Sequence, residues 1–423
     1  MTNNTPVWHP FTQHGVEPQM PLVTRTEGAY LYSADGNKIL DAISSWWVIT
    51  HGHRHPKIVD AIVETTQSLD QVIFAGFTHQ PAEDLATALV EMAPKGLTRV
   101  FYSDSGSTAV EVALKMALGH FKHLGEARSR LIVMEHSYHG DTIGTMSVGE
   151  RGVFNSPYTP LLFDVDTIPF PHKGREQATL DALEALTKSR DAAALIVEPL
   201  VLGAGGMLMY PAWVLAEMRR ITTQSGTLLI ADEVMTGWGR TGTMFACEQA
   251  SITPDILCTS KGITGGLLPL AATLASEAVY QSHYSTDRAR TFFHSSSYTA
   301  NPIACAAAFA NVKIWRDEPV MGRITALAAE HKSQLKRFES NPHFENIRAS
   351  GTIAALDLRV SATGYLADVG PKMRAFFMSR GILIRPLGNV LYLMPPYCVT
   401  PDELTQIYDA IEEAGQIFGN ADE

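Results

Sequence analysis

Between about residue 56 and residue 310, short apolar runs alternate with longer segments whose apolar residues recur at helical spacing. Uninterrupted apolar runs of four or five residues are typical of strands buried on both faces, and helical segments between them are typical of parallel strands. The pattern therefore predicts an α/β fold with a mostly parallel central sheet covered on both faces. The predicted strands are Arg99–Tyr102, Leu131–Met134, Ala194–Val197, Leu228–Ala231 and Leu270–Leu274.

The two ends of the chain have a different pattern. Near the N-terminus, Tyr30–Tyr32 and Lys38–Leu40 flank an Asp-Gly pair, which is a hairpin signal. After about residue 310 the pattern becomes helix, short strands (Leu383–Arg385 and Val390–Met394) and a final helix that opens with the capping box Thr400–Glu403. We therefore predict an N-terminal segment that packs with the small domain, a large domain and a C-terminal small α+β domain, at residues 1–55, 56–310 and 311–423.

Composition narrows the class of protein. The chain has 423 residues, of which 45% are hydrophobic and 18% charged, and its formal net charge is −11, which argues against nucleic-acid binding. Its four cysteines are widely spaced, so neither a disulfide framework nor a zinc site is predicted, and we expect a reducing cytoplasm. The N-terminus lacks the features of a signal peptide, and glycines and prolines interrupt the longest uncharged run, so we expect no membrane span.

Three alternating histidines, His51, His53 and His55, resemble a metal-binding pattern. No carboxylate or cysteine nearby completes a ligand set, and Pro56 then opens a helix. We interpret them as ordinary loop histidines and predict no metal.

The strongest chemical signal lies between Asp232 and Lys261. Asp232 follows the run Leu228–Ala231, at the end of a buried strand where α/β sheets bind their ligands. Lys261 lies among small, mostly uncharged residues, a setting that favours a lowered pKa and carbonyl chemistry. Alone, either residue is more simply a strand-end carboxylate or a surface lysine. Together they indicate a pyridoxal phosphate site, in which the lysine forms a Schiff base and the aspartate keeps the pyridine nitrogen protonated.

Other segments supply groups that such a site needs, and each has an ordinary alternative. Tyr102–Thr108 ends a strand and opens a helix, as in a phosphate cradle or a plain N-cap. Ser137–Thr142 offers an aromatic ring for stacking or is a capped turn, and Phe293–Pro302 offers hydroxyls for phosphate or is a solvated loop. Arg385 suits a substrate carboxylate or a structural ion pair, and the sequence leaves the two alternatives open.

The segment Gly237–Gly242 matches the dinucleotide-binding pattern G-x-G-x-x-G, but we reject that interpretation. The glycines do not directly follow the strand, no convincing helix begins there, and Asp232 and Glu233 would repel a pyrophosphate. We expect a flexible loop near the active site instead.

These segments together resemble the class III pyridoxal phosphate aminotransferases. The resemblance rests on Asp232–Val234, the Gly-x-Gly-Arg-Thr-Gly loop and Lys261-Gly262, and it extends from Trp8 to Tyr397. Narrower markers are similar to the branch that transfers an amino group from S-adenosylmethionine to 8-amino-7-oxononanoate in biotin biosynthesis. These markers are Ser44–Trp47, Asp104–Ser107, Tyr138–Thr142 and Arg385-Pro386. The resemblance implies a fold type I pyridoxal-phosphate transferase and a cytoplasmic homodimer with shared active sites.

The resemblance also implies roles for individual residues. Lys261 would carry the cofactor and move the proton, Asp232 would pair with the pyridine nitrogen, and Tyr138 would cover the ring and touch the substrate. The remaining residues would bind phosphate (Gly106 and Ser107, with Ser296 and Ser297 from the neighbouring subunit) or line the substrate site (Phe11, Trp46, Ser295 and Arg385).

The most important departure from the family pattern is Phe11, because relatives that use adenosylmethionine usually have a tyrosine there. The extended match favours adenosylmethionine as the donor, and lysine is the alternative because some relatives use it. Ser295, Leu202 and Met235 also differ from the family pattern, and we expect little harm from the serine. Another class III ω-aminotransferase is a further alternative. A non-catalytic pyridoxal-binding regulator is disfavoured, because no DNA-binding segment is visible.

Overall fold

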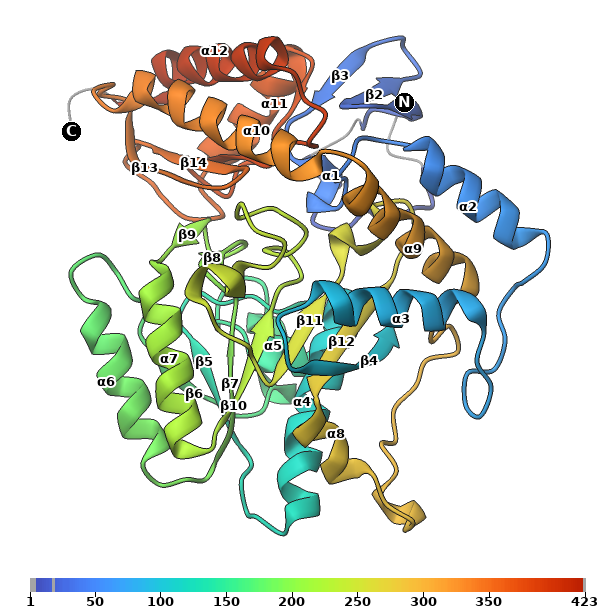
Figure 1. Cartoon of the computed structure of the whole chain (residues 1–423). Coiled ribbons are helices and arrows are strands. Elements are labelled where there is room, and N and C mark those ends of the chain that lie inside the picture. Colours follow the sequence, from blue (N-terminus) through green and yellow to red (C-terminus); the bar gives the residue numbers. More distant parts are fainter. Residues whose placement is uncertain (1–4, 17–19, 421–423) are drawn as a thin grey trace.

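The computed structural model describes residues 5–16 and 20–420. A sheet of seven strands forms its centre (Figure 1). The strands are β4 (Leu97–Ser103), β5 (Arg130–Met134), β6 (Asp166–Ile168), β7 (Ala192–Val197), β10 (Leu228–Asp232), β11 (Ile256–Thr259) and β12 (Ala271–Ser276). Their order is β4-β12-β11-β10-β7-β5-β6. Only β12 runs antiparallel to its neighbours in this sheet. The mostly parallel α/β sheet is therefore confirmed, and the sequence pattern missed β6 and β11.

Helices cover both faces of this sheet (Figure 1). Strand β10 shows how, because successive side chains of a strand point to opposite faces. Leu229 and Ala231 belong to the hydrophobic cluster of α6 (Glu176–Thr187) and α7 (Ala212–Ser225). Leu228 and Ile230 belong to the cluster of α4 (Gly106–Leu124) and α8 (Glu277–His283) on the other face. The other covering helices are α3 (Gln80–Met92) and α9 (Pro302–Asp317).

The two ends of the chain meet in a smaller layer above the large sheet (Figure 1). The predicted hairpin, β2 (Tyr30–Ser33) and β3 (Lys38–Asp41), is confirmed. Strand β3 also pairs with β15 (Ile382–Leu383), in the register Ile382↔Leu40. The helix start at Thr400 is confirmed, with its capping box. The other elements of this layer are β1 (Val23–Glu27), β13 (Phe344–Ser350), β14 (Ile353–Leu358), β16 (Val390–Leu393), α10 (Val320–Leu335), α11 (Val369–Ser379) and α12 (Pro401–Phe418).

The domain boundaries at residues 55 and 310 remain a proposal, and the second falls inside α9. The remaining helices and strands are mostly short. They are α1 (Ser44–Trp47), α2 (Pro56–Thr66), α5 (Ile143–Ser147), β8 (Val201–Leu202), β9 (Leu208–Met209), η1 (Ser156–Leu161), η2 (Ala246–Ala250), η3 (Lys261–Thr264), η4 (Arg288–Arg290) and η5 (Lys336–Phe338).

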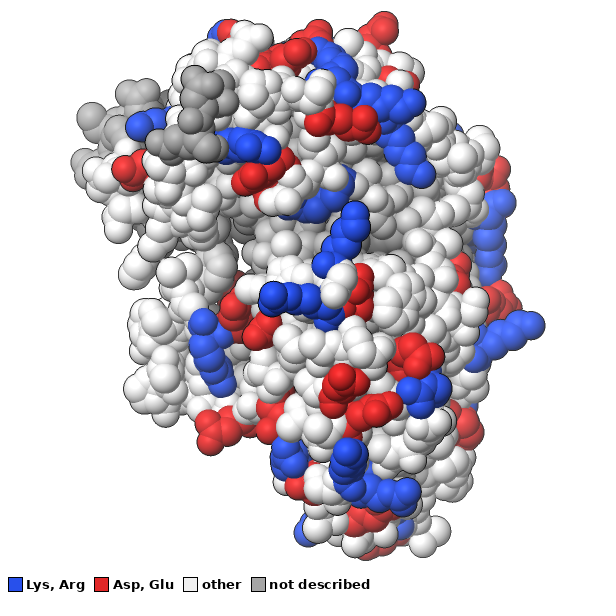
Figure 2. Space-filling model, turned by 90° about the vertical axis from the view of Figure 1, so that its left-hand side faces the viewer, with Lys and Arg blue, Asp and Glu red and all other residues white. Residues whose placement is uncertain are grey.

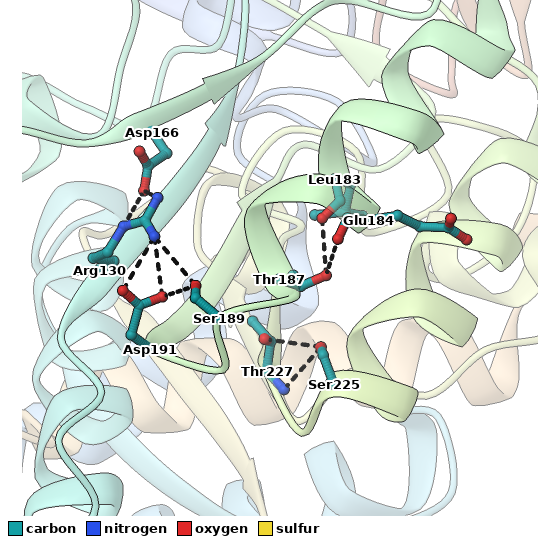
Figure 3. Close-up of polar contacts among 9 residues, drawn as sticks. All are labelled: Arg130, Asp166, Leu183, Glu184, Thr187, Ser189, Asp191, Ser225 and Thr227. Carbon is teal, nitrogen blue, oxygen red and sulfur yellow. Dashed lines mark hydrogen bonds and ion pairs between the residues drawn. The ribbon is translucent and has the colours of Figure 1, made fainter.

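Charged side chains tie together the edge of the sheet where β5, β6 and β7 begin (Figure 3). Arg130, the first residue of β5, donates hydrogen bonds to Asp166 at the start of β6 (2.8 Å) and to Asp191 just before β7 (3.0 Å). The starts of three parallel strands are thus held in register by one guanidinium group. Their carboxyl ends lie at the opposite edge.

None of the described helices is both long enough and apolar enough to cross a membrane. On the face drawn in Figure 2, basic and acidic side chains are interspersed and do not gather by sign.

Candidate active site

The carboxyl edge of the large sheet brings the predicted chemical residues together. Asp232 is the last residue of β10, and Lys261 follows β11 by two positions. The two strands are parallel neighbours, with Asp232 in register with Cys258. Tyr138 follows β5 and Glu198 follows β7 at the same edge. The site therefore forms where an α/β sheet offers its ligand crevice.

The Asp232 carboxylate is buried and oriented on both oxygens. Its Oδ2 accepts a hydrogen bond from His139 Nδ1 (2.6 Å), and its Oδ1 accepts one from the Val234 backbone N–H (3.1 Å). The second ring nitrogen of His139 is buried and has no hydrogen-bond partner among the residues described. A carboxylate held in this orientation can form an ion pair with a protonated ring nitrogen of a bound ligand.

The Lys261 side chain is partly buried, and its amine has no ionic partner among the described residues. Burial lowers its pKa, and the charges of Asp232 and Glu198 oppose that effect. Within the described parts of the chain, Lys261 makes no side-chain hydrogen bond or ion pair, and its Nζ lies 5.3 Å from the centroid of the Trp47 ring. Trp47 is fixed in turn by an N–H bond to the Tyr392 hydroxyl (3.0 Å). An amine with a lowered pKa and no ionic partner suits carbonyl chemistry.

The N-terminus of α4 fits a phosphate group. Ser105 caps the helix, and the first N–H groups of a helix have no partner within it. A Cβ at Gly106 would lie 2.7 Å from a methyl carbon of Val234, and one at Gly140 would lie 2.1 Å from Ser107 Oγ. Ser107 Oγ also accepts a hydrogen bond from the Asp141 N–H (3.3 Å). The loop that carries Tyr138 therefore lies directly against this helix start.

Three residues predicted to bind substrate lie together, although they are distant in sequence. The rings of Phe11 and Trp46 are 5.6 Å apart, and the Arg385 guanidinium lies 5.3 Å from the Trp46 ring. Arg385 also donates a hydrogen bond to the Phe11 carbonyl (2.8 Å). Arg385 has no carboxylate partner among the described residues, which disfavours the alternative that this arginine serves only in a structural ion pair. Trp46 is 44% exposed and Trp47 only 6%, since adjacent side chains cannot share one face.

No contact within the described chain brings Lys261 to Ser296 and Ser297, predicted to bind phosphate, or to Ser295, predicted to line the substrate site. Ser295 Oγ donates to the Ser296 carbonyl, and Ser296 bonds to Thr299 and Tyr298. All these partners lie in the same segment, between α8 and α9, which runs along the outside of the large domain (Figure 1). The predicted contribution of Ser296 and Ser297 to a neighbouring subunit stays a prediction.

The loop Gly237–Gly242, expected to be flexible, is buried and well anchored. Arg240 is 1% exposed and donates hydrogen bonds to the carbonyls of Ile49 (2.8 Å) and Pro395 (2.9 Å). The expectation was wrong because the glycines allow tight packing here: a Cβ at Gly239 would lie 2.4 Å from Ile324 Cδ1. The loop joins both ends of the chain to the large domain.

Sequence reasoning assigned no role to His139, Glu198 or Trp47. His139 and Glu198 each lie near a strand end, which is a usable signal. The contacts of His139 with Asp232 and of Glu198 with Tyr138, however, each join residues that are 60 or more positions apart in sequence. Among the described residues no cluster of three or more potential ligands is placed to hold a metal ion. His51 and His53 instead bond to Asn311 (2.7 Å) and Asp41 (3.0 Å).

Comparison with known proteins agrees with this geometry. The family model for class-III aminotransferases matches residues 11–414. This chain belongs to the class-III aminotransferases. Two curated relatives are named adenosylmethionine-8-amino-7-oxononanoate aminotransferase. The one from Synechococcus elongatus is 47% identical over 98% of this chain and 99% of its own. The one from Nitratidesulfovibrio vulgaris is 40% identical over 96% and 80%.

Solved structures show the same fold over nearly the whole chain. The adenosylmethionine-8-amino-7-oxononanoate aminotransferase of Methanocaldococcus jannaschii has a TM-score of 0.93 at 33% identity and 97% coverage of both chains. An amine transaminase from an uncultivated Pseudomonas species, solved in its pyridoxal-phosphate-bound form, has a TM-score of 0.93 at 31% identity, covering 99% of this chain and 100% of that one. The unpaired lysine, the oriented aspartate and the start of α4 fit the same cofactor, pyridoxal phosphate.

Proposed function

We propose that this class-III aminotransferase transfers an amino group from S-adenosylmethionine to the ketone of 8-amino-7-oxononanoate, giving 7,8-diaminononanoate for biotin biosynthesis. The observation that carries the proposal is the full-length similarity to relatives of that name, at 47% identity in one case. The cluster of Phe11, Trp46 and Arg385 supports it, because it offers aromatic surface and an unpaired guanidinium to an acceptor that has a carboxylate.

Pyridoxal phosphate, when bound, supplies the carbonyl that takes up the amino group and the ring that withdraws electrons from the substrate carbon. Lys261 is the residue that would carry it. With its pKa lowered by burial, the Lys261 amine is also suited to take the proton from the substrate Cα and to return it. Asp232, oriented by His139, would keep a proton on the pyridine nitrogen. Gly106 and Ser107 would bind the phosphate at the start of α4.

Tyr138 would cover the cofactor ring and touch the substrate. Burial raises the pKa of its hydroxyl, and the neighbouring Asp141 adds to that effect. The hydroxyl therefore stays protonated over the working pH range and remains a hydrogen-bond donor. Arg385 would bind the acceptor's carboxylate, and Phe11, Trp46 and Ser295 would line the substrate site.

We also propose a cytoplasmic homodimer with shared active sites. Ser296 and Ser297 would bind the phosphate in the partner's active site. Neither serine contacts Lys261 within the described chain, which is consistent with this role. Large exposed apolar side chains in this segment and in the loop before α3 support an interface, because clustered exposed apolar side chains often mark a site of protein–protein contact. They are Ile73 (65% exposed), Phe77 (67%), Phe293 (71%) and Tyr298 (63%).

Single-turnover half-reactions test the donor. The purified enzyme is mixed separately with S-adenosylmethionine, lysine and a simple primary amine, and the visible absorbance of the bound cofactor is followed. We expect conversion by S-adenosylmethionine. Conversion by lysine alone would overturn the assignment of S-adenosylmethionine as the donor and would leave the assignment of the acceptor unchanged. Conversion by the simple amine alone would support the second candidate, an amine transaminase, which the Pseudomonas structure favours.

A further inference from the structure

Glu198 is a buried carboxylate that the reaction described above does not use. It follows β7 at the carboxyl edge of the sheet and is 5% exposed. Its Oε1 accepts a hydrogen bond from the Tyr138 backbone N–H (3.0 Å), and its Oε2 accepts one from the Gly203 N–H (2.9 Å). One side chain thus connects two loops at the edge where Lys261 and Asp232 lie.

Both loops form part of the wall of the active site. The first carries Tyr138, the ring expected to cover the cofactor. The second passes so close to Trp47 that a Cβ at Gly203 would lie 3.2 Å from the indole, and Trp47 faces the Lys261 amine at 5.3 Å. The two loops also touch, since a Cβ at Gly205 would lie 2.1 Å from the His136 carbonyl oxygen. Moving Glu198 would therefore move both walls of the site.

We propose that Glu198 is a positioning residue of this active site, whose carboxylate holds the Tyr138 and Gly203 loops together and whose negative charge acts on the Lys261 amine. The proposal rests on the role of Lys261 proposed above and not on the identity of the amino donor. A purely mechanical tether would need only the two hydrogen bonds. The charge adds a second function, because it favours the protonated form of the Lys261 amine, the group that carries the proton.

The surroundings of Glu198 make that charge dependent on pH. Burial raises the pKa of Glu198 to about 7, and the charge of Asp232 adds to the rise. His139 and the two backbone N–H groups act against it. Tyr138, Tyr210 and Lys261 also face the carboxylate. Glu198 is therefore neutral below that pH and charged above it. When Glu198 is neutral, the oxygen that carries the proton is a weaker acceptor for its backbone N–H group.

The sign of the effect on stability follows from linkage. A carboxyl group whose pKa is higher in the folded protein than in the unfolded chain contributes stability below the unfolded value, and this contribution is lost as the pH rises to about 7. Glu198→Gln removes the titration. The melting temperature of the variant relative to the wild type should therefore rise between pH 5 and pH 8.

Two variants of the holoenzyme separate the effect of the Glu198 charge from the effect of its hydrogen bonds to the two loops. Glu198→Gln keeps the size and loses the charge, whereas Glu198→Asp keeps the charge and shortens the reach. The readout is the pH titration of the visible absorbance of the bound cofactor, together with KM and kcat. We expect Glu198→Gln to lower the titration midpoint by about one pH unit, since a nearby opposite charge shifts a pKa by that order. Glu198→Asp should keep the wild-type midpoint and raise KM.

The control is Glu184→Gln, the same chemical change on α6, at a side chain 48% exposed in an ion pair with Arg220; it should leave the midpoint unchanged. Equal titration midpoints in the wild type and Glu198→Gln would overturn the proposal. A midpoint in Glu198→Asp that is shifted as far as in Glu198→Gln would also overturn it. A relative melting temperature that does not change with pH would also overturn it, and this readout needs no cofactor signal. Failure of S-adenosylmethionine as donor, with the titration difference intact, would overturn only the donor assignment.

Discussion

Replacing Arg240 with methionine should destabilise the protein, because this one side chain joins both ends of the chain to the large domain. Its guanidinium group donates to the carbonyls of Ile49 and Pro395 and lies 5.0 Å from the Tyr397 ring. No carboxylate among the described residues pairs with it. Burial lowers the pKa of Arg240, and the charges of Tyr397 and Asp41 counter this. The side chain is thus a cation solvated by backbone carbonyls.

The expected cost follows from the groups left behind. Arg240 also makes a long hydrogen bond to the Trp47 carbonyl (3.5 Å), which we leave out of the sum. The two carbonyls with short bonds would lose their donor, at about 1–3 kcal/mol each. Removing the desolvated charge offsets part of this loss, which leaves a net destabilisation of roughly 2–4 kcal/mol. At about 2.1 cal/mol/K per residue, a chain of 423 residues has an unfolding entropy of roughly 0.9 kcal/mol/K. The melting temperature should therefore fall by roughly 2–5 °C.

Thermal unfolding followed by circular dichroism measures this shift. The matched control is Arg337→Met, which makes the same change at a side chain 31% exposed, paired with Asp409 and Glu412. Exposed pairs contribute about 0–1 kcal/mol, so the control should melt within roughly 1 °C of the wild type. Equal melting of the Arg240 variant and the control would refute the argument that the buried carbonyls depend on this guanidinium.

Three further predictions concern the reaction. Asp232→Asn should lower turnover on the order of 10²-fold or more, because asparagine has no charge to keep a proton on the pyridine nitrogen; near-normal steady-state turnover with the cofactor bound would contradict this role. Arg385→Ala should slow the acceptor half-reaction far more than the donor half-reaction in single-turnover kinetics, and equal slowing would indicate a structural role. Phe11→Tyr should improve the use of S-adenosylmethionine, since a hydroxyl adds a hydrogen-bonding group next to Trp46; an unchanged kcat/KM would mean that position 11 does not touch the donor.

The sequence predicted the site's central pair because strand ends have a local signal. Asp232 closes an apolar run, and any parallel sheet brings such ends to one edge. Strand β11, immediately before Lys261, was missed because its four residues include Cys258 and Thr259 and form no long apolar run. The His139 contact with Asp232 spans 93 positions, and no local pattern encodes a partner at that distance.

The substrate side was harder to predict, for a different reason. Phe11 and Trp46 were assigned to the substrate site through resemblance, and the residues alone left two alternatives open for Arg385. The proximity of the three depends on the pairing of the first and last parts of the chain. The loop around Arg240 was misjudged because its glycines suggest freedom, whereas the structure uses them for close packing. Composition alone does not distinguish these two uses of glycine.

The pairing of β3 with β15 has a consequence for synthesis on the ribosome. Leu40 leaves the ribosome 342 residues before its partner, Ile382, which at 5–20 residues per second is a wait of roughly 17–70 s. During this time one edge of β3 has no strand to pair with, and unpaired edges attract other chains. That edge of β3 therefore stays open to pairing with other chains until β15 has been synthesised. Premature termination anywhere before residue 382 would release a chain whose β3 edge cannot be covered by its own strand.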